Sequence, residues 1–154
     1  MRKYARQFIA KKISLSYEPV ETTVITDKKW LSFVIEQVIS NAVKYTKTGG
    51  IKIYLEDGDG TMSVPVQKAS HRKEDDGENS GMKSVRLVIE DTGIGIRAED
   101  LPRICEMGYT GCNGHEGQHS SGIGLYLCSR ILKKLGHTFS ITSKEGVGTV
   151  VKIG

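Results

Sequence analysis

The chain has 154 residues, of which 38% are hydrophobic and 26% are charged; this composition predicts one globular domain and excludes collagen-like, coiled-coil and wholly disordered chains. The 22 basic and 18 acidic residues are mixed along the chain and leave a net charge of only +4, so no nucleic-acid interface is expected. The sequence has no apolar run of about 18 residues that could span a membrane, and its three cysteines form no CxxC pair of the kind that binds zinc.

The first part of the chain is predicted to be extended and then helical. Residues 3–25 are expected to be extended, with one strand over 13–17, where apolar and polar residues alternate, and another over 20–25, which is rich in β-branched residues. Asp27 is a candidate helix N-cap. From Lys28 onward the apolar residues follow a helical period, which the glycine pair at 49–50 ends.

A long polar segment then separates two predicted strands. The strands cover residues 51–55 and 85–90, where apolar residues recur at the spacing of a half-buried strand. Residues 57–83 between them are charged and poor in apolar side chains. Because a loop of this length is uncommon in a compact domain, we interpret 57–83 as an insertion between two paired strands, with a short hairpin end near 62–67.

The last part of the chain contains a second long helix and a closing hairpin. A short helix is expected over 99–106, followed by a glycine-rich polar segment over 108–121. The helical period resumes at Gly122 and ends at Gly136, and residues 139–142 and 149–153 form the hairpin. The strands and helices do not alternate regularly, so the sequence predicts an α+β fold with helices layered on one face of a mixed, mostly antiparallel sheet.

One face of the first long helix carries polar side chains with distinct chemistry. Gln37, Asn41, Lys44 and Tyr45 lie at i, i+4, i+7 and i+8, which places them on one side of a helix. An asparagine carbonyl oxygen suits Mg²⁺, a lysine can meet a phosphate, and a tyrosine ring can stack on a base. A solvated polar face is the alternative interpretation.

Two further motifs favour a nucleotide. The segment Asp91-Thr92-Gly93-Ile94-Gly95-Ile96 follows a strand, so its carboxylate can accept from an exocyclic amine while the glycines let a planar base approach the backbone. The segment Ser120-Ser121-Gly122-Ile123-Gly124-Leu125 opens a helix, where free N–H groups bind anions. A simple turn and an ordinary glycine-containing helix start are the alternatives. Neither a Rossmann fingerprint nor a Walker motif is present.

Together with Gly146-Val147-Gly148-Thr149 in the closing hairpin, these motifs resemble the ATP-binding catalytic domain of bacterial sensor histidine kinases. That domain belongs to a superfamily shared with gyrase B, the heat-shock chaperone of ninety kilodaltons and mismatch-repair ATPases. The resemblance covers residues 11–153 and implies a Bergerat-type two-layer α/β sandwich that binds ATP and Mg²⁺. The later pattern E-M-G-Y-T-G, S-G-I-G-L-Y-L and L-G-H is similar to the kinases that respond to antimicrobial peptides at the cell envelope.

The resemblance also implies roles for individual residues. Asn41 matches the Mg²⁺ ligand, Lys44 the phosphate contact, Tyr45 the aromatic residue beside adenine, and Asp91 the acceptor of the adenine amine. The remaining residues assigned to ATP are Gly93, Gly95, Ile96, Tyr109, Thr110, Ser121, Gly122, Ile123, Gly124, Leu125 and Thr149. Residues 97–121 match the lid over ATP, although Cys105 stands where phenylalanine is usual.

The candidate catalytic residues are Glu36, Gln37 and Lys44. Glu36 is a candidate base for an acceptor imidazole. Gln37 stands where the resemblance expects asparagine, or glutamate in the hydrolysing relatives, and a glutamine cannot activate water as a carboxylate does. The alternatives to a kinase are a non-catalytic nucleotide-binding module and an ATP-hydrolysing relative of the same superfamily.

The histidines predict what the chain lacks. His71, His115, His119 and His137 do not occur in the H-E-x-x-x-P setting of a phosphoacceptor. Residues 1–154 are therefore expected to be a catalytic fragment that binds ATP without autophosphorylation. The resemblance implies a homodimeric, membrane-anchored whole protein with this domain in the cytoplasm, a histidine acceptor on a separate dimerisation domain, and a cognate response regulator as partner.

Overall fold

The computed structural model describes residues 4–19, 22–58, 84–111 and 121–154. Most of the predicted 57–83 insertion, including the hairpin end near 62–67, lies outside the described residues, as do residues 112–120 of the predicted lid. The elements are, in chain order, α1 (Ala5–Lys11), β1 (Ser14–Tyr17), α2 (Lys28–Tyr45), β2 (Gly50–Asp57), β3 (Val85–Asp91), α3 (Gly124–Leu135), β4 (Phe139–Lys144) and β5 (Gly148–Ile153).

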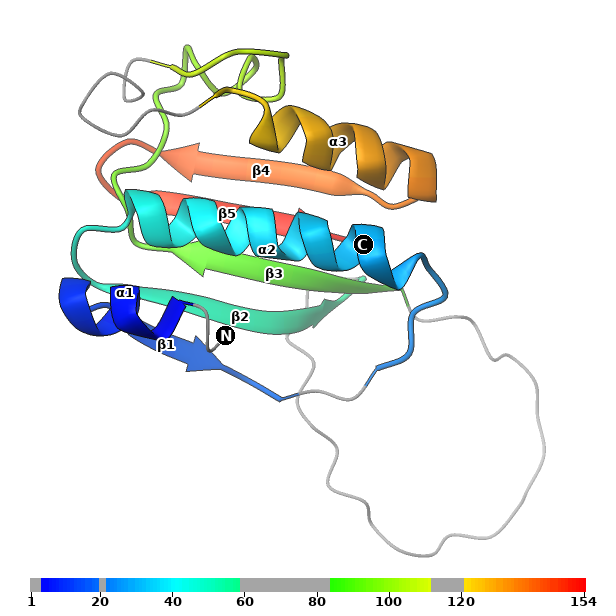
Figure 1. The fold of residues 1–154 in the computed structure, drawn as a ribbon, viewed down its shortest axis with the longest axis horizontal. Helices are drawn as coiled ribbons and strands as arrows, with labels where there is room; N and C mark the ends of the chain where they lie inside the picture. The colour runs from blue at the N-terminus through cyan, green and yellow to red at the C-terminus, as the bar shows by residue number, and fades with distance from the viewer. Residues whose placement is uncertain (1–3, 20–21, 59–83, 112–120) are drawn as a thin grey trace, which may run out of the picture.

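The strands form one mixed sheet, in the order β1-β2-β3-β5-β4. β1 pairs with β2 in parallel, and the other three pairs are antiparallel. All three helices lie on the same face of this sheet (Figure 1). The predicted α+β sandwich is therefore confirmed, and so is the pairing of the two strands that flank the insertion.

The core lies between the sheet and the helices. Ile51 pairs with Asp91, and Ile89 lies between Ile53 and Val151, so every second residue of the central strands points toward the helices. These residues pack against buried side chains of α2 and α3, among them Val34, Val38, Ala42, Cys128 and Leu132. The helical period of the sequence predicted this face of α2, and Asp27 caps the helix through bonds to the N–H groups of Lys29 and Trp30 at 2.9 and 3.2 Å.

The prediction that residues 3–25 are extended is wrong at both ends of β1. Residues 5–11 form α1 because the turn at Tyr4 and the helix together bury Tyr4 and Phe8, two side chains one helical turn apart, against the core. Lys11 also ends α1 beside the C-terminus of α2. Residues 22–25 form no strand, because Val24 and Ile25 are exposed and pair with no neighbouring strand.

The short helix expected over 99–106 is also absent. Successive turns replace it, with i to i+3 bonds from Arg103 N–H to the Asp100 carbonyl and from Glu106 N–H to the Arg103 carbonyl, each 2.8 Å. Pro102 lies within this stretch and has no N–H to continue a helix. No helix of the described residues is long and apolar enough to cross a membrane.

The opposite face of the sheet carries an ion-pair cluster. Glu56 is only 4% exposed, and its carboxylate accepts two hydrogen bonds from the Lys152 ammonium at 2.9 and 2.7 Å. The Arg86 guanidinium lies 3.6 Å from the same carboxylate. A buried carboxylate needs such partners, and this cluster therefore joins β2, β3 and β5 on the side away from the helices.

Candidate functional site

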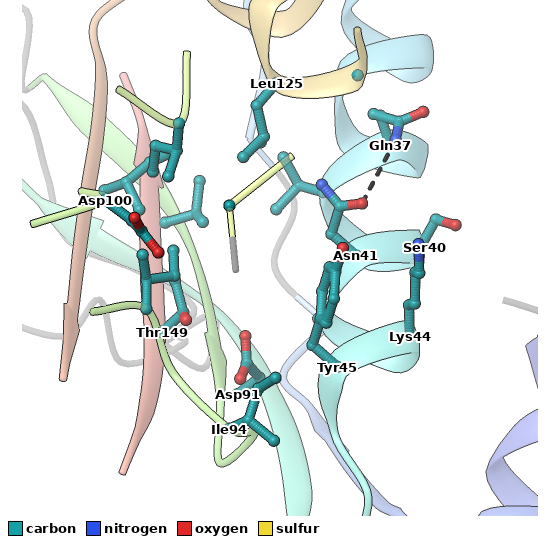
Figure 2. A pocket seen from close by; sticks show the side chains of 18 of the residues that line it. Gln37, Ser40, Asn41, Lys44, Tyr45, Asp91, Ile94, Asp100, Leu125 and Thr149 are labelled. Atoms are coloured by element: carbon teal, nitrogen blue, oxygen red, sulfur yellow. Dashed lines mark hydrogen bonds between the residues drawn. The ribbon is translucent and has the colours of Figure 1, made fainter. Parts of the chain in front are cut away.

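A cavity of about 360 Å³ opens between α2, the end of β3 and the start of α3 (Figure 2). It lies where the three sequence motifs meet, although they are far apart in the chain. The predicted site residues that line it are Gln37, Asn41, Lys44, Tyr45, Asp91, Gly95, Ile96, Tyr109, Thr110, Ser121, Gly122, Gly124, Leu125 and Thr149.

Three predicted site residues do not line the cavity. Glu36 is exposed on the neighbouring face of α2. Gly93 lies behind the cavity wall, where its N–H donates a 2.8 Å hydrogen bond to the Asp91 carboxylate. Ile123 is the N-cap residue of α3 and is 40% exposed. Gly93 thus supports a lining residue, whereas Glu36 and Ile123 are exposed outside the cavity lining.

The α2 wall presents the polar stripe predicted from the sequence. Gln37, Asn41, Lys44 and Tyr45 all reach the cavity, because the adjoining stripe of the helix packs against the sheet. The Gln37 amide nitrogen lies 3.5 Å from the Asn41 carbonyl oxygen, to which it donates. The Lys44 ammonium lies 5.1 Å from the centre of the Tyr45 ring. This wall therefore offers amide oxygen, positive charge and an aromatic ring in order along the helix.

Asp91 provides the acidic group at the end of β3, opposite Thr149 of β5. Burial raises the pKa of its carboxyl group, while hydrogen bonds from the backbone N–H groups of Gly93 and Thr149 act in the opposite direction. The charged form thus lacks full solvation and gains from a further donor. An exocyclic amine entering the cavity would supply one.

The loop after β3 is held rigidly at both sides. The Ile94 N–H donates to the Tyr45 carbonyl oxygen at 3.2 Å, and the Gly146 N–H donates to the Ile94 carbonyl oxygen at 2.8 Å. Gly95 has φ +70°, and a side chain there would collide with the Lys144 carbonyl. The glycine is required because the loop passes directly against the β4–β5 turn. The wall around Asp91 is therefore preformed.

The start of α3 is suited to an anion. In contrast to α2, which Asp27 caps, α3 has no side-chain hydrogen bond at its N-cap among the described residues. Gly122 precedes the helix with φ +66°, and its carbonyl accepts a 3.1 Å bond from the Gly108 N–H. Gly122 and Gly124 line the cavity, so the first N–H groups of the helix can reach a bound phosphate.

Sequence reasoning missed Asp100, whose carboxylate also lines the cavity. Asp100 is 7% exposed and accepts a 2.5 Å hydrogen bond from the Tyr109 hydroxyl. The Arg103 guanidinium lies 4.4 Å from the centre of the Tyr109 ring. The sequence did not predict this arrangement because it predicted a helix over 99–106. The turns found there instead bring Asp100 inward.

The apolar lining was missed as well. Its members come from α2, from the strands β3, β4 and β5 and from the segment after β3, namely Val38, Ile89, Ile141, Val151, Ile94 and Ile104. Alternation in the sequence marks several of them as buried, but only the pairing of β3, β4 and β5 shows that they face an open space. They provide the apolar surroundings that a planar base requires.

The donor set fits Mg²⁺ in one specific way. The described residues contain no group of three or more His, Cys, Asp or Glu side chains that could hold a metal ion. The amide oxygen of Asn41 lines the cavity beside the start of α3. Mg²⁺ commonly keeps several waters and is held by few protein groups together with substrate phosphates, so Asn41 and a bound polyphosphate form an adequate site.

Comparison with known proteins gives one family. Residues 26–154 match the family described as histidine kinase-, DNA gyrase B-, and HSP90-like ATPase. The chain is 36% identical over 132 residues to the sensor histidine kinase YxdK of Bacillus subtilis, covering 84% of this chain and 33% of that protein. It is 34% identical over 134 residues to the sensor protein kinase GraS of Staphylococcus aureus, covering 87% of this chain and 32% of that protein.

Solved structures share the fold. Full-length ShkA, determined in complex with AMPPNP, superposes with a TM-score of 0.69 at 20% identity over 99% of this chain and 27% of that chain. The catalytic domain of histidine kinase ThkA gives a TM-score of 0.69 at 20% identity over 99% of this chain and 84% of that chain. The chain spans about a third of the length of the curated relatives it matches.

Proposed function

This chain belongs to the histidine kinase-, DNA gyrase B- and HSP90-like ATPase family, and we propose that its cavity binds Mg-ATP and presents the γ-phosphate to a histidine of another domain. The observation that carries the proposal is the convergence of Asn41, Lys44, Asp91 and the uncapped start of α3 on one cavity. These groups suit a metal, a phosphate, an adenine amine and an anion, respectively.

In the proposed complex the adenine base lies at the Asp91 end of the cavity. Its exocyclic amine donates to the Asp91 carboxylate, which the Gly93 N–H already orients. Tyr45 and the apolar lining cover the faces of the ring. Guanine has a carbonyl in place of the adenine amine, so its oxygen would meet the carboxylate and leave it unpaired.

The phosphates are placed between α2 and the start of α3. Asn41 would hold Mg²⁺ through its carbonyl oxygen, and the ion supplies charge neutralisation of the phosphates when bound. Lys44 contributes a second positive charge, and the first N–H groups of α3 contribute hydrogen bonds. Catalysis of phosphoryl transfer then consists mainly of positioning and electrostatic stabilisation.

We place the acceptor histidine outside this chain. Among the described residues, His137 is engaged at both ring nitrogens, by the Gly154 carbonyl at 3.1 Å and the Thr26 hydroxyl at 2.9 Å. The match covers only about a third of each relative's length, which leaves room in such a protein for a dimerisation domain with the acceptor. Glu36 is exposed on α2 beside the cavity, where it can meet an incoming imidazole.

The wider setting follows from the same proposal. The matched relatives are sensor kinases; by analogy we place this domain on the cytoplasmic side of a membrane-anchored homodimer that passes its phosphate to a response regulator. A response to antimicrobial peptides at the cell envelope is the corresponding proposal for the signal.

Titration calorimetry tests the metal and nucleotide assignment. Asn41→Ala should weaken Mg-ATP binding by about 1.5–3 kcal/mol, the usual contribution of one interaction with a charged group. Ser32→Ala on the exposed face of the same helix serves as the control and should bind like the wild type. Unchanged Mg-ATP affinity in Asn41→Ala contradicts the metal assignment.

A transfer assay tests the reaction itself. The chain is incubated with γ-labelled ATP alone, and then with a separate dimerisation domain that carries an H-E-x-x-x-P histidine. The proposal predicts acid-labile, base-stable label on the second polypeptide and none on this chain. Steady release of inorganic phosphate without any labelled protein would indicate a hydrolase instead.

A further inference from the structure

Gln37 occupies the space between the metal-binding position and the start of α3. It lies one helical turn before Asn41 on α2, and its amide nitrogen donates to the Asn41 carbonyl oxygen at 3.5 Å. In Figure 2 the Gln37 amide points toward Asn41 along the helix. Gln37 is half-buried, so this contact is partly shielded from water.

The same side chain also lies against the first residue of α3. A Cβ added at Gly124 would lie 2.5 Å from the Gln37 amide nitrogen and 3.0 Å from its amide carbon. Only a glycine leaves this space, and Gly124 does not have a positive φ that would require glycine for backbone reasons. The absence of a side chain at Gly124 therefore accommodates Gln37.

The hydrogen bond restricts the orientation of the Asn41 amide. A carbonyl oxygen has two lone pairs, and the Gln37 N–H occupies one of them, so the second stays available for a cation. The bond also keeps the oxygen directed toward Gln37 and the start of α3, which is the side on which the phosphates are placed. Without a donor at position 37, the Asn41 amide is free to rotate and present its nitrogen instead.

We propose that Gln37 is a positioning residue that holds the Asn41 carbonyl oxygen in its metal-binding orientation and that Gly124 is a glycine to make room for it. The inference rests on the proposed function, because it assigns the metal-binding role to Asn41. It gives Gln37 a role distinct from catalysis: Gln37 acts on the metal through Asn41 and need not touch the nucleotide.

The test separates metal-dependent from metal-independent binding. Calorimetry measures the dissociation constant of ATP with excess MgCl₂ and again with EDTA, and the ratio of the two constants is the Mg²⁺ enhancement. Gln37→Met keeps the length of the side chain but removes the donor. It should lower the enhancement about threefold to tenfold, as expected for one lost hydrogen bond, because the constant with MgCl₂ rises more than the constant in EDTA. Gln7→Met on the exposed side of α1 is the matched control.

Double variants show whether Gln37 acts through Asn41. In an Asn41→Ala background, Gln37→Met should cause no further loss of enhancement. Gly124→Ala should lower the enhancement in the wild-type background, because its methyl group displaces the Gln37 amide, but should not lower it further in a Gln37→Ala background.

Three results overturn the inference. The first is a Gln37→Met variant whose Mg²⁺ enhancement equals that of the wild type. The second is a Gln37→Met variant whose ATP affinity falls equally in MgCl₂ and in EDTA, which indicates a merely structural role. The third is an additive loss in the double variant with Asn41→Ala. Failure of the proposed function is distinguishable from these, since a wild-type chain that binds no ATP under either condition overturns that function and this inference together.

Discussion

The Tyr109 hydroxyl donates a 2.5 Å hydrogen bond to the buried carboxylate of Asp100. The two residues lie in different turns, so the bond joins the segment at Tyr109 to the earlier turn at Asp100, which follows β3. The Arg103 guanidinium lies over the Tyr109 ring, 4.4 Å from its centre, and forms a 3.1 Å ion pair with Glu106. One wall of the cavity is thereby built from residues outside any helix or strand.

Tyr109→Phe should destabilise the chain by about 1–3 kcal/mol, because it leaves a buried acceptor without its donor. The ring and its contact with Arg103 remain, so the loss reports the hydroxyl alone. Urea unfolding measures the change, with Tyr17→Phe at an exposed position of β1 as the control. Equal unfolding midpoints for Tyr109→Phe and the wild type would show that the bond contributes nothing.

Lys11 connects α1 to the end of the helix that carries the site. Its ammonium donates to the carbonyl oxygens of Val43, Lys44 and Thr46 at 2.7, 3.0 and 3.3 Å. A cation at a helix C-terminus interacts favourably with the helix dipole and satisfies carbonyls that lack partners in the helix.

Lys11→Met should therefore lower the free energy of unfolding by about 1–2 kcal/mol. The methionine retains most of the aliphatic stem, so packing changes little. Lys28→Met, at an exposed position in the first turn of α2, removes the same charge and should leave stability nearly unchanged. The Lys11 account does not survive if both variants unfold at the same urea concentration as the wild type.

The sequence could predict the site better than its surroundings. The helical period places Asn41 and Lys44 on a polar stripe that adjoins the core-facing stripe of Val34 and Val38, which predicts contact with a ligand, and the structure places both in the cavity. Asp91 and the glycines of the two motifs could also be predicted from the sequence, because a strand end and a helix start are local features of the chain. The β2 and β3 strands, α2 and α3 were also predicted, because their apolar periods are long.

The failures have a common physical cause, which is tertiary contact. α1 is short and its apolar residues could belong to a strand, so only the packing of Phe8 against the core and the contact of Lys11 with α2 decide the matter. Asp100 turns inward because Tyr109 supplies a donor, and no local pattern encodes that pair. The Gln37–Gly124 contact likewise depends on how α2 and α3 pack.

The raised pKa of Asp91 has a consequence for stability without nucleotide. Burial is the main cause of the shift, so the folded state binds a proton more tightly than the unfolded state, whose carboxyl has a pKa of about 4. The stability that protonated Asp91 contributes is present below the unfolded pKa and is lost as the pH rises through the folded pKa.

Asp91→Asn removes this titration and retains an oxygen acceptor for the Gly93 N–H. Its free energy of unfolding, relative to that of the wild type, should therefore rise between about pH 4 and neutral pH. Urea unfolding of both proteins across this interval gives the comparison. If the free energy of unfolding of Asp91→Asn, relative to the wild type, falls as the pH rises, the surroundings stabilise the Asp91 carboxylate and do not disfavour it.

The most direct test of the account is the base preference of the cavity, measured by calorimetry with ATP and GTP in the presence of Mg²⁺. Because Asp91 accepts the adenine amine in the proposed complex, ATP should bind at least about 100-fold more tightly than GTP, and Asp91→Asn should abolish binding or remove the preference. Equal affinities of the wild-type chain for ATP and GTP would contradict the account.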